Sequence, residues 1–211
     1  MVRLFIVRHA QSSFNLENRY QGRLDPALTE LGILQAKSLA KHLKNYPISA
    51  VYTSPLKRTY DTALEISKAL GLEPVVDDRL IEIDHGVWSG MLVDEVQSKF
   101  SEDFNLWLNS PHEVYFKEGE SLKEVEQRVV DILKYISSNH QGENVAIVSH
   151  SVPMRVIYCK VLDIGLERFW SFGCDNACYS VIDFGIERSV MVRLNVTCHL
   201  GELYVEAHRA I

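Results

Sequence analysis

The chain has 211 residues, of which 46% are hydrophobic and 24% are charged, a composition typical of a globular protein with a sizeable core. Its formal net charge of −6 disfavours a broad surface for nucleic acid or anionic membranes, so an anionic ligand would need a local cationic pocket. Apolar runs are too short to span a bilayer or to form a secretory signal. We therefore expect one cytoplasmic domain over residues 1–211, without nucleic-acid or membrane partners.

The first third of the chain alternates between strand and helix patterns. Residues 2–7 are apolar except for Arg3 and do not alternate with polar residues, which is typical of a strand buried on both faces. Thr29-Glu30 is expected to precede a helix that runs to about Lys44, because the apolar residues of this segment recur with helical spacing. A short strand over residues 50–53 follows, and Ser54 and Pro55 are then expected as the N-cap and first-turn proline of a helix that ends near Leu70.

The remaining elements follow the same alternation until the C-terminal third. Residues 84–118 carry glycines, a proline and several aromatics, so loops and short helices are expected there. The other expected elements are a short strand over 73–76, a long helix over 121–139, a buried strand over 144–148, a helix starting at Ser151 and Pro153, and paired strands over 179–184 and 190–196.

This order of elements predicts an α/β three-layer sandwich with a mostly parallel central sheet and helices on both faces. Ligands of such sheets bind beyond the carboxyl ends of the strands. His9 and His150 each follow an apolar strand at that edge, and the turn that carries Arg58 follows a third strand. The sequence therefore predicts a site where these three segments meet.

The side chains at this edge favour phosphate over a metal. Arg8 and Arg58 have the planar fork that suits phosphate oxygens, and an arginine that ends a buried strand needs a polar partner. The chain contains neither a GxxxxGK loop nor an HExxH motif, and it lacks a dense cluster of acids for magnesium. Cys174 and Cys178 with Cys198 fit a zinc site poorly, and we expect small buried thiols instead. The expected site uses no metal and no cofactor.

The motifs occur in one order along the chain and together resemble the histidine phosphatase, or phosphoglycerate-mutase-like, superfamily. They are Arg8-His9 with Asn15, Gln21-Gly22, Ser54-Pro55-Leu56-Lys57-Arg58-Thr59, Leu80-Ile81-Glu82 with Gly86, Gly119-Glu120-Ser121 and Val148-Ser149-His150. The segments "IDHG", "SFGCDNACYSV" and "CHLGELYVEAHRAI" are similar to the metal-independent phosphoserine phosphatases of that superfamily.

The resemblance implies a role for each matching residue. His9 would attack phosphorus through one neutral nitrogen, while its other nitrogen donates to a backbone carbonyl. Arg8, Arg58 and His150 would stabilise the phosphoryl oxygens with help from Asn15. Glu82 would act as general acid and then as general base, which requires a raised pKa.

Further substrate contacts are implied at four positions, which are Gln21, Gly22, His85 and Ser151. His85 could contact a substrate carboxylate, or it could be an ordinary loop histidine. The C-terminal tail reaches the site only if it folds back; otherwise it is a mobile terminus. The chain departs from the usual family motif at Ala10 and Gln11 and has Ser149 where glycine is frequent.

The function implied is hydrolysis of a small phosphorylated substrate, L-phosphoserine first, by a cytoplasmic homodimer. Three alternatives stay open. They are a phosphoglycerate mutase that uses the same phosphohistidine, a broad-specificity phosphatase and an inactive phosphate-binding regulatory subunit. Turnover measurements on a substrate panel would separate them.

Overall fold

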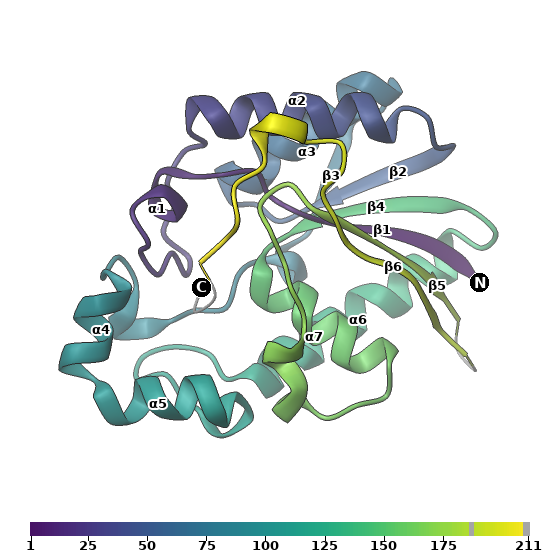
Figure 1. Cartoon of the computed structure of the whole chain (residues 1–211). Helices are drawn as coiled ribbons and strands as arrows, with labels where there is room; N and C mark the ends of the chain where they lie inside the picture. The colour runs from purple at the N-terminus through teal and green to yellow at the C-terminus, as the bar shows by residue number, and fades with distance from the viewer. Residues whose placement is uncertain (186–187, 209–211) are drawn as a thin grey trace.

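The fold is built on a six-stranded sheet, seen in the computed structural model, which describes residues 1–185 and 188–208 (Figure 1). The strand order is β3-β2-β4-β1-β5-β6. The strands are β1 (Val2–Arg8), β2 (Ile48–Thr53), β3 (Pro74–Val76), β4 (Asn144–Ser149), β5 (Tyr179–Phe184) and β6 (Val190–Val196). The first four are parallel, and β5 and β6 add an antiparallel pair on one side of β1.

Helices cover both faces of the sheet, which confirms the predicted three-layer α/β sandwich (Figure 1). α2 (Glu30–Leu43) and α3 (Lys57–Leu70) pack on one face, and α6 (Leu122–Asn139) and α7 (Ser151–Val161) pack on the other. Successive side chains of β1 point to opposite faces. Phe5 and Val7 therefore join the core under α2 and α3, whereas Leu4 and Ile6 join the core under α6 and α7.

Short helices lie beyond the carboxyl end of β1 and frame the site. They are α1 (Ser13–Leu16), α4 (Val93–Lys99), α5 (Ser101–Asn109) and the short 3₁₀ segments Asp78–Leu80, Gly86–Trp88, Pro111–Glu113 and Leu166–Ser171. A further 3₁₀ turn, Gly201–Leu203, packs against α2. Figure 1 shows the last described residues running from beside the middle of α2 toward this region. Loops and short helices were predicted for residues 84–118, and this prediction is confirmed.

The predicted start of α3 is wrong by two residues. Ser54 and Pro55 do not cap the helix; its N-cap is Leu56, which makes no side-chain capping bond. The hydroxyl of Ser54 instead contacts the His150 ring, as described below. By contrast, the helix predicted in this region is confirmed as α2, and its N-cap is Thr29, whose Oγ1 accepts a hydrogen bond from the backbone N–H of Gly32 at 2.9 Å.

Cysteine burial agrees with the sequence prediction at three of four positions. Cys159, Cys174 and Cys178 are buried free thiols, whereas Cys198 is exposed because it lies after β6 in the segment that leads to the tail. No helix within residues 1–185 and 188–208 is long and apolar enough to cross a membrane.

Candidate active site

The pairing of β1 with β4 brings the two predicted histidines together. The two strands are parallel with Arg8 opposite Ser149, so the residues that follow them, His9 and His150, leave the sheet side by side. The backbone N–H of His9 donates to the Ser149 carbonyl at 3.0 Å. The two rings lie edge to face with their centroids 5.2 Å apart.

His9 is held as one neutral tautomer. Its Nδ1 lies 2.7 Å from the backbone carbonyl of Ala10, and a carbonyl can only accept, so Nδ1 carries the proton and Nε2 has a free lone pair. Burial lowers the pKa of His9 well below 6.5, and the charges of Arg58 and Arg8 lower it further. A neutral imidazole with one free nitrogen can act as a nucleophile at neutral pH.

Two buried guanidinium groups flank this ring. Arg8 Nη1 donates to the Cys174 carbonyl. Arg58 donates through Nη1 to the Leu24 carbonyl at 2.7 Å and through Nη2 to the Gly22 carbonyl at 2.9 Å. Among the ion pairs of the described residues, none joins Arg8 or Arg58 to a carboxylate within 4.0 Å. Two buried positive charges without a paired carboxylate make a pocket for an anion.

Glu82 supplies a buried carboxyl group to the same region. Its Oε1 accepts from the backbone N–H of Ile83 at 2.9 Å, and its Oε2 lies 3.4 Å from the hydroxyl of Ser151. Burial raises the pKa of Glu82 above its ordinary value, although the charge of Arg58 opposes this shift. A carboxyl group with a raised pKa can hold and release a proton near neutral pH.

His150 is fixed by the residue that sequence reasoning placed at a helix cap. Its Nε2 lies 2.8 Å from Ser54 Oγ. Burial lowers the pKa of His150 well below 6.5, and nearby Arg58 and His9 add to the effect, so the ring is neutral. Ser149, just before it, donates its hydroxyl to the Leu80 carbonyl at 2.7 Å. Ser149 therefore fastens β4 to the segment that carries Glu82.

The predicted substrate contacts divide into two groups. A narrow cavity of about 20 Å³ is lined by Gln21, Gly22, His85 and Ser151 together with Arg8 and Glu82. Asn15 is not part of that lining. It closes a capping box with Ser12 at the start of α1, and its Oδ1 lies 3.2 Å from Nδ2 of Asn176. Gly22 requires glycine, since its φ is +51° and a Cβ would come within 2.5 Å of Ser89 Oγ.

His85 sits in an aromatic cluster rather than on a loop surface. Its ring centroid lies 5.0 Å from that of Tyr20, 5.1 Å from Phe116 and 6.2 Å from Trp107. Burial lowers the pKa of His85 to about 3. The ring is therefore neutral, and it can offer a substrate an N–H group or a lone pair but not a positive charge.

The unusual residues after His9 contact α3 and the N-cap of α2. Gln11 Oε1 accepts from Thr29 Oγ1 at 2.8 Å, and the Gln11 carbonyl accepts from the Thr29 backbone N–H at 3.0 Å. The backbone N–H of Ala10 donates to Thr62 Oγ1 at 3.1 Å. Gln11 thus ties the strand end to the N-cap of α2, which accounts for a neutral side chain there.

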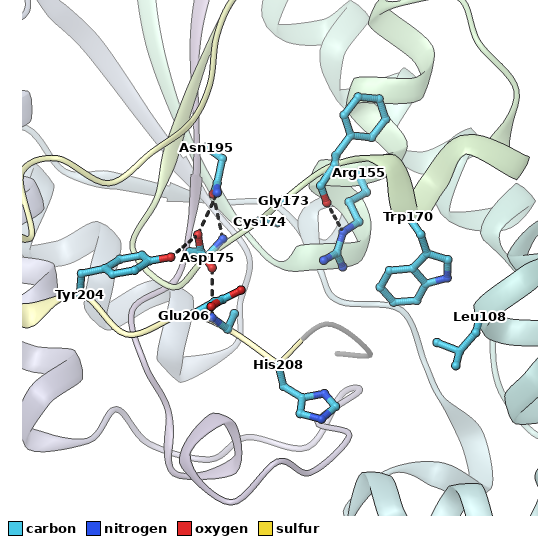
Figure 2. Close-up of a pocket in the computed structure, with 12 residues that line it drawn as sticks. Leu108, Arg155, Trp170, Gly173, Cys174, Asp175, Asn195, Tyr204, Glu206 and His208 are labelled. Carbon is cyan, nitrogen blue, oxygen red and sulfur yellow. Dashed lines mark hydrogen bonds between the residues drawn. The ribbon is translucent and has the colours of Figure 1, made fainter.

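Sequence reasoning assigned no role in the site to the segment over residues 174–176 or to Arg155 of α7. Asn176 Nδ2 donates to the His9 carbonyl at 3.3 Å, and the Cys174 carbonyl holds Arg8. Asp175 accepts from Asn195, Tyr204 and the backbone N–H of Ala207 (Figure 2). Backbone acceptors carry no residue-type signal, so the sequence could not indicate the Cys174 contact.

A neutral histidine with a free nitrogen, two buried arginines and a buried carboxyl group define a site for phosphoryl transfer. The family model of the histidine phosphatase superfamily (branch 1) matches residues 4–197. The chain belongs to this superfamily, and the resemblance inferred from its motifs is confirmed.

Individual relatives narrow the class to phosphatases. The chain is 56% identical over 211 residues to phosphoserine phosphatase 1 of Hydrogenobacter thermophilus, covering all of both chains. It is 32% identical over 162 residues to a metal-independent phosphoserine phosphatase of Arabidopsis thaliana, covering 75% of this chain and 68% of the relative. Among solved structures, Bacillus stearothermophilus YhfR superimposes with a TM-score of 0.89 at 29% identity, covering 95% of this chain and 100% of that one.

Proposed function

We propose that the chain is a metal-independent phosphoserine phosphatase that works through a phosphohistidine at His9. The observation that carries the proposal is the 2.7 Å contact between His9 Nδ1 and the Ala10 carbonyl, which leaves Nε2 free to attack. The full-length identity of 56% to a phosphoserine phosphatase supports the choice of substrate. Hydrolysis would release L-serine, and this reaction would be the last chemical step of a route of serine biosynthesis.

In the first step His9 Nε2 attacks phosphorus, and a P–N bond forms as the ester P–O bond breaks. Glu82 gives its proton to the departing serine oxygen, which leaves as a neutral hydroxyl. Arg8, Arg58 and His150 hold the nonbridging oxygens, and the two guanidinium groups offset the charge on the transferred group. The raised pKa of Glu82 favours the protonated form that this step requires.

In the second step water attacks the phosphohistidine. The Glu82 carboxylate takes a proton from that water, the P–N bond breaks, and the electron pair returns to His9 Nε2. Inorganic phosphate leaves, and Glu82 is again protonated. Asn15, Gln21, Gly22 and Ser151 are proposed as further contacts around the substrate; the last three line the narrow cavity beside Glu82.

The substitution His9→Ala tests the nucleophile. Turnover of L-phosphoserine should fall by at least about 1,000-fold, because the covalent route is lost. When wild-type protein is incubated briefly with ³²P-labelled substrate and quenched in alkali, the protein should carry ³²P that acid then releases. The variant should carry no label. A rate near that of the wild type would refute the assignment, and Lys41→Ala on the exposed face of α2 is the matched control.

Phosphate release and phosphoryl exchange separate the proposal from its alternatives. Phosphate release from L-phosphoserine should continue in excess chelator, and a loss that magnesium restores would refute metal independence. Fast exchange on 3-phosphoglycerate with little hydrolysis would identify a mutase. Similar kcat/KM values across sugar, aryl and amino-acid phosphates would identify a broad-specificity phosphatase. If none of these phosphates were turned over, the chain would be a regulatory subunit.

The proposal includes a cytoplasmic homodimer, as the family resemblance implies. Sedimentation equilibrium of the purified chain should give about twice the monomer mass of 24.1 kDa. A single species at the monomer mass over the whole concentration range would remove this part of the proposal and leave the chemistry untouched.

A further inference from the structure

Arg155 is a buried cation at the junction of two cavities. It lies on α7 five residues after His150, and only 4% of it is exposed. With Arg8 and Glu82 it lines the narrow cavity described above. It also lines a larger cavity of about 600 Å³ with Trp170 and Asp175 (Figure 2). A molecule whose phosphate lies near Arg8 would place its other end near Arg155.

The guanidinium group of Arg155 is fixed in orientation. Its Nε donates to the Phe172 carbonyl at 3.1 Å. Its Cζ lies 4.7 Å from the ring centroid of Trp170 and 5.4 Å from that of Phe169, so aromatic rings hold the planar group. Nη1 is buried and has no hydrogen-bond partner among the described residues. A buried charged donor without a partner is costly, so this arrangement is suited to an incoming acceptor.

The charge of Arg155 is also unmatched in the described part of the chain. None of the ion pairs there joins it to a carboxylate within 4.0 Å. Arg19, which lines the same narrow cavity, is already paired with Glu17 at 2.6 Å. His85 is neutral and supplies no charge. Arg155 is therefore the lining cation best placed to meet a second negative group.

We propose that Arg155 binds the carboxylate of the substrate through the unpartnered Nη1 and so selects phosphoesters of hydroxy-carboxylates and hydroxy-amino acids. The inference deepens the proposed function and rests on it for the position of the phosphate. The facing wall of the larger cavity carries the carboxylates of Asp175 and Glu206 (Figure 2). Walls of opposite charge match an amino-acid end that carries both an ammonium and a carboxylate.

The test compares substrates that differ only in the carboxylate. O-phosphoethanolamine is L-phosphoserine without that group. The wild type should prefer L-phosphoserine in kcat/KM, and Arg155→Met should reduce the ratio of the two kcat/KM values by about 100-fold, because a charge-assisted hydrogen bond in a buried site is lost. Arg155→Lys keeps the charge but loses the fork, so the ratio should fall by about 10-fold. Arg3→Met, which removes an exposed ion pair with Asp183, should leave the ratio unchanged.

Several results would overturn the assignment. One is an equal loss on both substrates in Arg155→Met, which would identify a packing role. If that variant does not fold, Arg155→Lys decides, and an unchanged ratio refutes the proposal. If the wild type does not hydrolyse L-phosphoserine, the proposed function fails separately. The pair 3-phosphoglycerate and glycerol 3-phosphate then tests Arg155 on its own, and an unchanged ratio with Arg155→Met refutes the carboxylate role.

Discussion

Asp175 holds the C-terminal tail at the edge of the site through hydrogen bonds, and Asp175→Asn should weaken the attachment of the tail. The carboxylate accepts from the backbone N–H of Ala207 at 3.1 Å and from the hydroxyl of Tyr204 at 3.3 Å (Figure 2). It also accepts from Asn195 Nδ2 at 2.8 Å. The amide keeps the shape of the carboxylate but removes its charge and replaces one acceptor with a donor.

The size of the effect follows from these contacts. Hydrogen bonds to an ionised group are roughly twice as strong as neutral ones, so each tail contact should weaken by about 0.5–1 kcal/mol. Two contacts together give about 1–2 kcal/mol, which corresponds to a population of the released tail about 5- to 30-fold higher. Hydrogen exchange of the Ala207 amide reports this population directly, because that N–H is one of the two donors.

The measurement is amide exchange of the whole chain by NMR at fixed pH. Asp175→Asn should speed exchange at Ala207 by about 5- to 30-fold, while amides of β1 keep their rates. Tyr204→Phe removes only the longer contact, so its effect should be smaller, about fivefold or less. An unchanged rate at Ala207 in Asp175→Asn would refute the view that Asp175 holds the tail.

Two other substitutions test the packing of α2 and the protonation of Glu82. Gly32→Ala should lower the free energy of unfolding in urea by about 1–3 kcal/mol, although alanine has the better helix propensity. The reason is that the alanine Cβ would come 2.0 Å from the Gln11 carbonyl oxygen. A neutral or stabilising result would contradict this close packing. Glu82→Gln should raise Tm near pH 8 but not below pH 4.5, the ordinary pKa of Glu82. Because the pKa of Glu82 is raised in the folded state, the folded protein loses stability as the pH rises through that folded-state pKa, and glutamine does not ionise. An equal Tm difference at both pH values would show that ionisation is not the cause.

The sheet and its helices could be predicted from the sequence because apolar periodicity records burial directly. The apolar residues of β1 are buried on both faces of the sheet, and the apolar stripe of α2 faces the core. The start of α3 could not be predicted in this way. Ser54 has the side chain of a good N-cap, but a tertiary contact with His150 uses its hydroxyl, and local propensity yields to such contacts.

The centre of the site was predictable because its residues end strands at one edge of the sheet, where parallel topology brings them together. His9 and His150 are the clearest cases. Arg155 was not predictable, because it lies inside an apolar helical segment and resembles an interior position of α7. Its proximity to the phosphate pocket arises from the packing of α7 against Phe169 and Trp170, which the sequence pattern of α7 does not encode.

The position of β1 between β4 and β5 has a consequence for the order of synthesis. Arg8 and His9 are synthesised long before the strands that pair with β1, because β4 and β5 comprise residues 144–149 and 179–184. The carbonyl that holds Arg8 belongs to Cys174, and the amide that holds the His9 backbone belongs to Asn176. During translation the anion pocket therefore cannot form until Asn176 has left the ribosome. A truncated nascent chain would thus carry the nucleophile without the surroundings that keep it neutral and correctly oriented.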